Sequence, residues 1–344
     1  MRTIAQRLND AISAYVQEHI GEIYSVLLPQ FVTAGDTEMV IHLLRECPLN
    51  SETESLGVAP LVAAARAGNL EMTRLLLEHK HLPHVVAEMN EAVNVAFSAN
   101  HKEIVRVLLQ AGADQTVFRG SGKSFFSSTL LIEAARGGDL EMVKLLLEGG
   151  ADVNASGESR FPSGPPFGEE YTALTAATEK GHLETTRVLL EAGADPNRLN
   201  PLLAAVYNND RDAVQLLIKY GALIERPYGS ENDDRVHSAL VDACRHGMIE
   251  MVQLLIDEGA HVNARDGSGN TALTYAVLLG REEISMALTK HGADRTQTDR
   301  LLQDSVKRAE VTDRLQGDCF YSQIEDYRPF CRGTSLCSDC NWPC

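Results

Sequence analysis

The sequence has no long apolar run. Charged residues interrupt every apolar stretch of its 344 residues before it could span a bilayer. The first segment, MRTIAQRLNDAISAYVQEHI, contains no uninterrupted apolar core either. We therefore predict no membrane insertion and an intracellular location, in the cytoplasm, the nucleus or both.

Basic residues are also scarce. The 31 lysines and arginines are outnumbered by 48 aspartates and glutamates, which gives a formal net charge of −17. Such a surface does not attract phosphate backbones in general. Residues 1–25 contain only Arg2 and Arg7 as strong bases. The composition therefore argues against direct binding of nucleic acid.

Cysteine is sparse except near the end of the sequence. Cys47 and Cys244 lie within helical patterns, and the other five of the seven cysteines fall in the last 26 residues, unlike the framework of a secreted disulfide protein. Weak candidates for zinc ligands are Cys331, Cys337, Cys340 and Cys344, because Cys337-x2-Cys340 has the spacing of half a zinc site. Three alternatives stay open for this tail: structural zinc, reactive thiols, or an irregular segment without metal.

Signatures of catalysis are lacking as well. No nucleophile stands at a recognisable spacing from a base and an orienting acid. The run Arg119-Gly-Ser-Gly-Lys-Ser124 has Val117 where a phosphate-binding loop needs glycine. His79, His81 and His84 are better explained as a loop of solvated histidines than as metal ligands. We therefore predict a non-enzymatic protein without a cofactor.

What the sequence does contain is a repeated unit. In Leu130–Asn154, LLIEAARGGDLEMVKLLLEGGADVN, a short amphipathic helix ends at Gly138 and a second one runs from Leu140 to Leu147. Two small helices cannot bury their leucines alone, so copies of the pair are expected to stack. The turn between the helices recurs with spacings of 33, 32, 38, 43, 28, 38 and 33 residues, at Gly35, Gly68, Asn100, Gly138, Gly181, Asn209, Gly247 and Gly280.

This period and its motifs resemble the ankyrin repeat. The resemblance rests on segments such as TLLIEAARGGDLEMVKLLLEGGADVNA from Thr129, TALTAATEKGHLETTRVLLEAGADPN from Thr172 and ALVDACRHGMIEMVQLLIDEGAHVNA from Ala239. It implies an all-α repeat solenoid, a stack of helix-turn-helix units with β-hairpin fingers. We assign a capping helix to residues 1–25, about eight repeats to 26–298, a second capping helix to 299–316 and an irregular tail to 317–344.

Three connections between repeats are long, and one is short. Residues 115–128 carry Phe118, Arg119, Lys123, Phe125 and Phe126 and no acidic residue. Residues 156–170 carry Arg160, Phe161 and Phe167 among glycines and prolines, which argue against a regular element. The third long connection is 224–237, whereas DPNRLNPLL, after the fifth copy, is predicted to carry a truncated finger. Neutral variation of loops and a recognition surface both explain the long connections.

A second candidate surface lies just before the turn positions. The residues there resemble the family's concave positions and include Arg66, Arg136, Lys180, Tyr207, Arg245 and His246. A basic row would suit an acidic or phosphorylated segment, and a structural role is the alternative. Similarity to the family implies structural hydrogen bonds for His101 and His182. It also implies that Asn154, Asn197 and Asn263 hold hairpin turns, with hydroxylation as an alternative role.

The leading functional hypothesis is a monomeric scaffold or adaptor that binds a protein or peptide through the fingers and the concave groove. A regulatory subunit or transcription coregulator acting through protein contacts is the first alternative. A ligand-binding protein or enzyme with a site between the long fingers is the second.

Overall fold

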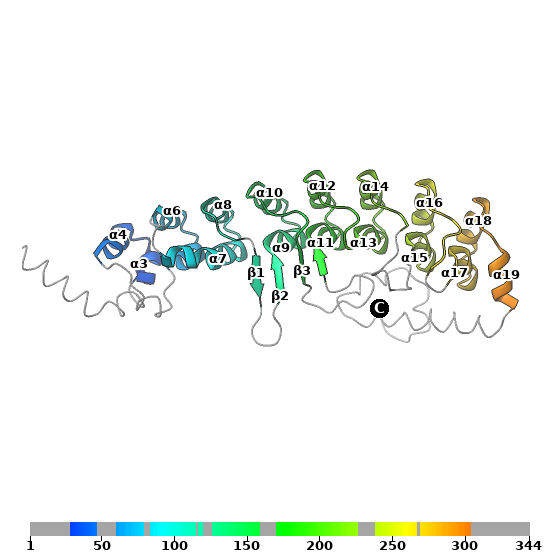
Figure 1. The fold of residues 1–344 in the computed structure, drawn as a ribbon, viewed down its shortest axis with the longest axis horizontal. Coiled ribbons are helices and arrows are strands. Elements are labelled where there is room, and N and C mark those ends of the chain that lie inside the picture. Colours follow the sequence, from blue (N-terminus) through cyan, green and yellow to red (C-terminus); the bar gives the residue numbers. More distant parts are fainter. Residues whose placement is uncertain are drawn as a thin grey trace, which may run out of the picture. The chain divides into compact units, whose positions relative to one another are not determined.

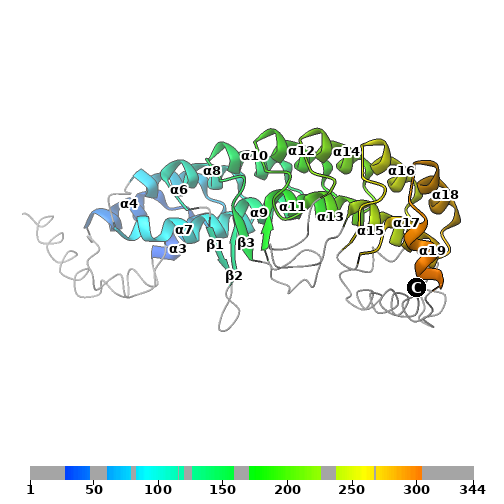
Figure 2. The same ribbon diagram turned by 45° about the vertical axis from the view of Figure 1, so that its right-hand side comes forward.

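The chain folds into stacked helix pairs. The computed structural model describes residues 28–46, 60–78, 83–114, 116–119, 126–158, 170–225, 238–266 and 269–303. It divides into two compact units: unit 1 contains Met1–Ala134 and Glu141–Asp152, and unit 2 contains Ala135–Leu140 and Val153–Cys344. Within each unit the first helices of successive pairs lie side by side in one layer and the second helices in another (Figures 1 and 2). The predicted all-α repeat solenoid is confirmed.

Eight helix pairs follow one another in the described residues. The pairs of unit 1 are α3 (Leu28–Ala34) with α4 (Thr37–Glu46), α5 (Pro60–Ala67) with α6 (Leu70–Glu78), and α7 (Pro83–Ser98) with α8 (Lys102–Ala111). Residues of α9 (Leu130–Gly137) and α10 (Leu140–Glu148) are divided between the units. The pairs of unit 2 are α11 (Ala173–Glu179) with α12 (Leu183–Glu191), α13 (Pro201–Tyr207) with α14 (Arg211–Lys219), α15 (Ala239–Arg245) with α16 (Ile249–Asp257), and α17 (Ala272–Leu278) with α18 (Glu282–Lys290).

All eight predicted turn positions lie between two helices and have a positive φ. The glycines among them have φ values from 66° to 77°, and Asn100 and Asn209 have 59° and 53°. Glycine reaches this left-handed region without steric cost, and asparagine tolerates it better than most residues do. The spacing of glycine and asparagine therefore located every turn correctly.

Small side chains let the first helices pack closely. Four residues before the turn position, alanine occurs in seven of the eight pairs, and each of these alanines is at most 2% exposed: Ala64, Ala96, Ala134, Ala177, Ala205, Ala243 and Ala276. The second helices contribute larger buried residues, such as Leu76 in unit 1 and Leu189 in unit 2. Burial of these apolar side chains is the main favourable contribution to stacking.

Two fingers contain antiparallel strands. In unit 1, β1 (Thr116–Arg119) pairs with β2 (Phe126–Thr129), with Arg119 opposite Phe126. In unit 2, β3 (Ser156–Glu158) pairs with β4 (Glu170–Thr172), with Gly157 opposite Tyr171. The expectation that residues 156–170 contain no regular element was wrong at both ends, because the prolines lie between the strands and remove no donor from the ladder.

The remaining connections of unit 2 differ from one another. After α12, residues 195–200 form turns without a strand, and Leu199 and Asn200 have φ values of 56° and 52°. The predicted truncation of this finger agrees with that geometry. Only residues 224 and 225 of the connection 224–237 are described. A single bridge, Arg265 with Thr271, marks the connection before α17.

The predicted end segments lie largely outside the described residues. This holds for the capping helix of residues 1–25 and for the tail 317–344. The last described helix, α19 (Thr296–Gln303), begins three residues before the predicted start at 299. Within the described part of the chain, no helix is long and apolar enough to cross a membrane.

Candidate functional site

The finger residues singled out in the sequence are only partly placed. Phe118 and Arg119 lie on β1 and Phe126 lies on β2, but only their backbone is described. Figures 1 and 2 show the two antiparallel strands on the side of the first helices that faces away from the layer of second helices. The other candidates lie outside the described residues: Lys123, Phe125, Arg160, Phe161, Phe167, Cys331, Cys337, Cys340 and Cys344.

Five residues that stand one or two positions before the turn positions of unit 2 are called the basic–aromatic row: Arg136, Lys180, Tyr207, Arg245 and His246. Each stands at or just beyond the C-terminal end of a first helix. That end of a helix carries partial negative charge, which favours basic side chains. The row therefore arises from the same turn in successive repeats.

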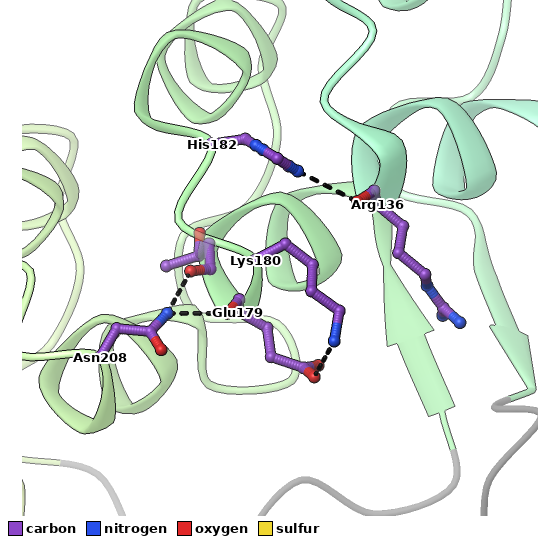
Figure 3. A network of polar contacts seen from close by, with 6 residues as sticks. Arg136, Glu179, Lys180, His182 and Asn208 are labelled. Atoms are coloured by element: carbon purple, nitrogen blue, oxygen red, sulfur yellow. Dashed lines mark hydrogen bonds and ion pairs between the residues drawn. The ribbon is translucent and has the colours of Figure 1, made fainter. Parts of the chain in front are cut away.

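Arg136 stacks on a tyrosine delivered by the finger. The guanidinium carbon lies 5.2 Å from the centroid of the Tyr171 ring, within the range of a cation–π contact. Tyr171 is 4% exposed and lies on β4 opposite Gly157, which adds no side chain on the neighbouring strand. Arg136 is half-buried at the end of α9. In Figure 3 its side chain extends toward the strands.

The backbone beneath Arg136 is fixed by the next repeat. Nε2 of His182 lies 3.1 Å from the Arg136 carbonyl oxygen and donates to it, because a carbonyl only accepts (Figure 3). This confirms the structural hydrogen bond expected for His182. In the following repeat Asn208 has the same role: its Nδ2 donates to the carbonyls of Thr178 and Glu179, each at 2.8 Å.

Lys180 is the exposed member of the row. Its Nζ lies 3.4 Å from Oε1 of Glu179, and the Lys180 side chain is 46% exposed. Such a partly exposed pair contributes little to stability. Figure 3 shows Lys180 and Glu179 extending to the same side as Arg136.

Tyr207 and His246 contact each other, and Arg245 contacts residues outside the row. The rings of Tyr207 and His246 meet edge to face with centroids 5.2 Å apart. Nδ1 of His246 donates to the carbonyl of Asp242 at 2.8 Å. Arg245 lies 3.6 Å from the buried carboxylate of Asp242, and its guanidinium carbon is 5.6 Å from the Tyr275 ring centroid. The positive charge of Arg245 is therefore compensated within the protein.

A polar cluster behind Arg245 was not found from the sequence. The hydroxyl of Tyr275 donates to Oδ2 of Asp266, and Nδ2 of Asn270 lies 3.4 Å from the same hydroxyl. Burial, followed by the interactions with Asp266, raises the pKa of Tyr275 well above its ordinary value. This cluster anchors the connection before α17 to the first-helix layer. No signal in the spacing pairs Tyr275 with Asp266.

Three equivalent asparagines tie each repeat connection to the next. Asn154 donates through Nδ2 to the Gly193 carbonyl at 3.2 Å and accepts through Oδ1 from the Asp195 amide at 2.8 Å. The corresponding contacts of Asn197 and Asn263 are with Gly221 and Leu223, and with Gly292 and Asp294. These asparagines were expected to hold the hairpin turn, and the structure shows that both side-chain groups bind the backbone of the following repeat.

Among the described residues of unit 1, one basic residue stands at an equivalent position and one acid is buried. Arg66 is exposed at the end of α5. Glu88 on α7 is 8% exposed, and its Oε2 accepts from the Leu61 amide at 2.8 Å. Burial raises the pKa of Glu88 to about 8, although amides of Leu61 and Val62 favour its charged form. Glu88 thus supports the start of α5.

The metal hypotheses gain no support from the described residues. No group of three or more histidine, cysteine, aspartate or glutamate side chains in that part of the chain could hold a metal ion. His84 lies in the first turn of α7, so the interpretation of a histidine loop was wrong at this residue, whereas His79 and His81 lie outside the described ranges. Cys244 is a buried thiol whose pKa is raised mainly by burial.

Comparison with known proteins agrees with the repeat pattern. The chain is 29% identical over 268 residues to the ankyrin repeat and KH domain-containing protein mask-1 of Caenorhabditis elegans, which covers 68% of the chain and 10% of that protein. It is 29% identical over 236 residues to the ankyrin repeat domain-containing protein SAT10 of Stachybotrys chartarum, which covers 68% of the chain and 9% of the relative. A shorter match, 39% identical over 62 residues, joins 18% of the chain to 12% of the human ankyrin repeat and SOCS box protein 18.

The family model covers most of the chain. The chain spans about a tenth of the length of the first two relatives. The model for ankyrin repeats matches three times, at residues 29–119, 131–228 and 202–299. These matches contain the described turn positions and the basic–aromatic row. The chain therefore belongs to the ankyrin-repeat family.

Proposed function

We propose that the chain is a non-enzymatic scaffold or adaptor that binds a protein or peptide through the basic–aromatic row and the β3–β4 finger beside it. Ankyrin repeats generally mediate protein–protein interaction, and the family is typically non-catalytic. We further propose an intracellular monomer whose partner offers an acidic segment. The β1–β2 finger of unit 1, with Phe118, Arg119 and Phe126, is a second proposed contact surface.

The observation that supports this proposal best is the fixed placement of the row. His182 and Asn208 hold the backbone at the ends of α9 and α11, and Tyr171 holds the Arg136 side chain. A surface whose side chains are already ordered loses little conformational entropy when it binds. Tyrosine and arginine are also the residue types that most often dominate binding energy at interfaces.

Charge supports the choice of an acidic partner. The chain has a formal net charge of −17, yet the row contains two arginines and one lysine, close together in the repeat pattern. Complementary charge contributes to specificity and register at interfaces. An acidic segment would be repelled by most of the surface and attracted by the row.

Affinity capture with matched variants tests the proposal. The row variant is Lys180→Ala with Tyr207→Ala. The control, Arg187→Ala with Tyr220→Ala, removes one cation and one exposed aromatic from α12 and the end of α14 in the same repeats. We expect the control to retain the wild-type partner and the row variant to bind it at least about tenfold more weakly. Equal binding by both variants would contradict the proposal.

A further inference from the structure

Two arginines of the row each lie over a tyrosine ring, but they differ in whether a carboxylate lies beside the guanidinium. Arg136 lies over Tyr171 and Arg245 lies over Tyr275, at 5.2 and 5.6 Å from the ring centroids. Both stand two residues before a turn glycine, Gly138 and Gly247. The repeat therefore presents the same cation on an aromatic ring twice within unit 2.

Arg245 is already paired with a carboxylate of the same chain. Its guanidinium lies 3.6 Å from Asp242, whose side chain is 0% exposed, and only 15% of the Arg245 side chain is exposed. Lys180 is paired as well, with Glu179 at 3.4 Å. These two cations have carboxylates of the chain itself as partners.

Arg136 has no such carboxylate among the residues that the structure describes. In the described part of the chain no acidic side chain forms an ion pair with its guanidinium, although Glu133 stands one turn earlier on the same helix. A cation–π contact leaves the N–H donors of a guanidinium available. Arg136 is thus a half-buried, ordered fork of donors in a protein of net charge −17.

We propose that Arg136, held over Tyr171, is the anion-binding position of the row and takes the carboxylate of an Asp or Glu side chain in an extended partner segment. The inference rests on the proposed function and names the chemical group that the partner supplies. A planar guanidinium matches a carboxylate with two parallel hydrogen bonds, which a lysine ammonium does not. The β3–β4 finger takes part because its Tyr171 holds the guanidinium in place.

The other basic positions are expected to discriminate less. Arg66 occupies the equivalent position in unit 1 but is exposed. An exposed arginine must lose side-chain entropy to form one fixed geometry, and its ion pairs contribute little. Arg66 is therefore a matched control, since replacing it removes the same charge from the same repeat position.

Selection from a library of short random peptides tests the proposal. Wild type, Arg136→Gln, Arg136→Lys and the control Arg66→Gln are each used as the immobilised protein, after circular dichroism and urea unfolding have confirmed their fold. We expect wild type and the Arg66 variant to enrich Asp or Glu at one peptide position, and Arg136→Gln to lose that enrichment. Arg136→Lys should retain part of it, because the charge remains while the planar fork is lost.

A double-mutant cycle on one selected peptide measures how much the contact between Arg136 and the acidic residue contributes to affinity. Replacement of its enriched Glu by Gln should weaken binding to wild type at least about tenfold, and should change binding to Arg136→Gln far less. The same peptide with phosphoserine in place of Glu shows whether the site prefers a phosphate or a carboxylate. Strong preference for phosphoserine with no preference for Glu over Gln would overturn the carboxylate assignment.

The outcomes separate this inference from the function on which it rests. If wild type selects peptides without an acidic preference, or if Arg136→Gln keeps the preference, the role of Arg136 is contradicted while peptide binding stands. If wild type selects no peptide and captures no protein, both are contradicted.

Discussion

The ring of His182 occupies the space that a side chain at Gly138 would need. A Cβ at Gly138 would stand 2.6 Å from the nearest ring atoms, while Nε2 of the same ring donates to the Arg136 carbonyl at 3.1 Å. The turn at Gly138 thus favours glycine for two reasons: a ring from the next repeat fills the space beside it, and the φ of Gly138 is 70°. A Cβ at Gly68 or Gly247 would likewise stand 2.8 Å from the His101 ring or 2.9 Å from the Arg281 guanidinium. The side-chain hydrogen bond expected for His101 is not found among the described residues, so that expectation was wrong.

We expect Gly138→Ala to destabilise the protein more than Gly181→Ala. Both glycines have a positive φ, 70° and 73°, but a Cβ at Gly181 would meet nothing within 4 Å. Gly181→Ala should therefore cost about 1 to 2 kcal/mol for the left-handed backbone alone. Gly138→Ala adds the clash with His182, at least about 1 kcal/mol more. Urea unfolding followed by circular dichroism measures the difference.

A double variant checks the cause of that difference. His182→Ala removes a hydrogen bond and should cost about 1 kcal/mol in wild type. It should cost less, or nothing, in the Gly138→Ala background, because it also relieves the clash. Additive effects of the two substitutions would show that the ring does not limit the turn.

Asn197→Ala should loosen the connection after α14. The side chain donates to Gly221 at 3.0 Å and accepts from Leu223 at 2.8 Å, so the substitution removes two hydrogen bonds. The contacts are exposed, and we expect a loss of about 1 to 2 kcal/mol. Amide hydrogen exchange should rise at Leu223, whose amide loses its acceptor. Unchanged exchange there would contradict this role.

Glu88 should make the stability of unit 1 depend on pH. Its folded-state pKa is raised by burial from 4.5 to about 8, so between these values the folded chain binds more protons than the unfolded chain. Protonated Glu88 therefore stabilises the folded chain fully below pH 4.5, and this stabilisation is lost as the pH rises through the folded-state pKa of about 8. We expect the free energy of unfolding to fall by more than about 1 kcal/mol across this window.

The Glu88→Gln variant supplies the control for that pH dependence. Glutamine keeps an acceptor for the Leu61 amide, at 2.8 Å in wild type, and cannot ionise. The variant should therefore lose this part of the pH dependence and should be more stable than wild type above the folded pKa. Parallel stability profiles of the two proteins would show that Glu88 does not titrate in the window.

The two arginines on tyrosine platforms should differ in their effect on stability. Arg245→Gln removes the cation beside the buried Asp242 and should cost about 2 kcal/mol or more. No carboxylate among the described residues is paired with Arg136, so Arg136→Gln leaves none unpaired. We therefore expect this substitution to lower the free energy of unfolding by less than about 1 kcal/mol. Chemical unfolding of the two variants makes the comparison. Equal costs would mean that Arg136 has a structural role like that of Arg245.

The sequence predicted the periodic features because each depends on a local rule. Turn positions required glycine or asparagine, as at Gly138 and Asn209, and the helix pairs followed from leucine and alanine spacing. The threonine that opens several repeats caps its helix, since Thr172 accepts from the Thr175 amide at 3.2 Å. These rules involve residues within a few positions of one another.

The candidate site depended on contacts that no local rule encodes. Arg136 contacts Tyr171 only because the β3–β4 finger brings the chain back to the end of α9. Tyr275 likewise contacts Asp266 only because the chain turns back before α17. Asn208 replaces the histidine of the neighbouring repeat at a shifted position, so alignment of the copies did not reveal its role. The strand pairing at the ends of residues 156–170 was missed because the glycines and prolines of this segment were taken to argue against any regular element.

Photocrosslinking tests most directly the claim that partners bind the basic–aromatic row. A photoreactive amino acid is placed at Lys180 in one protein and at Arg187 on α12 of the same repeat in another, where the native side chains are 46% and 41% exposed. Each protein is irradiated with the captured partner. We predict crosslinks from position 180 and few from position 187. Crosslinks from position 187 without any from position 180 would contradict the account.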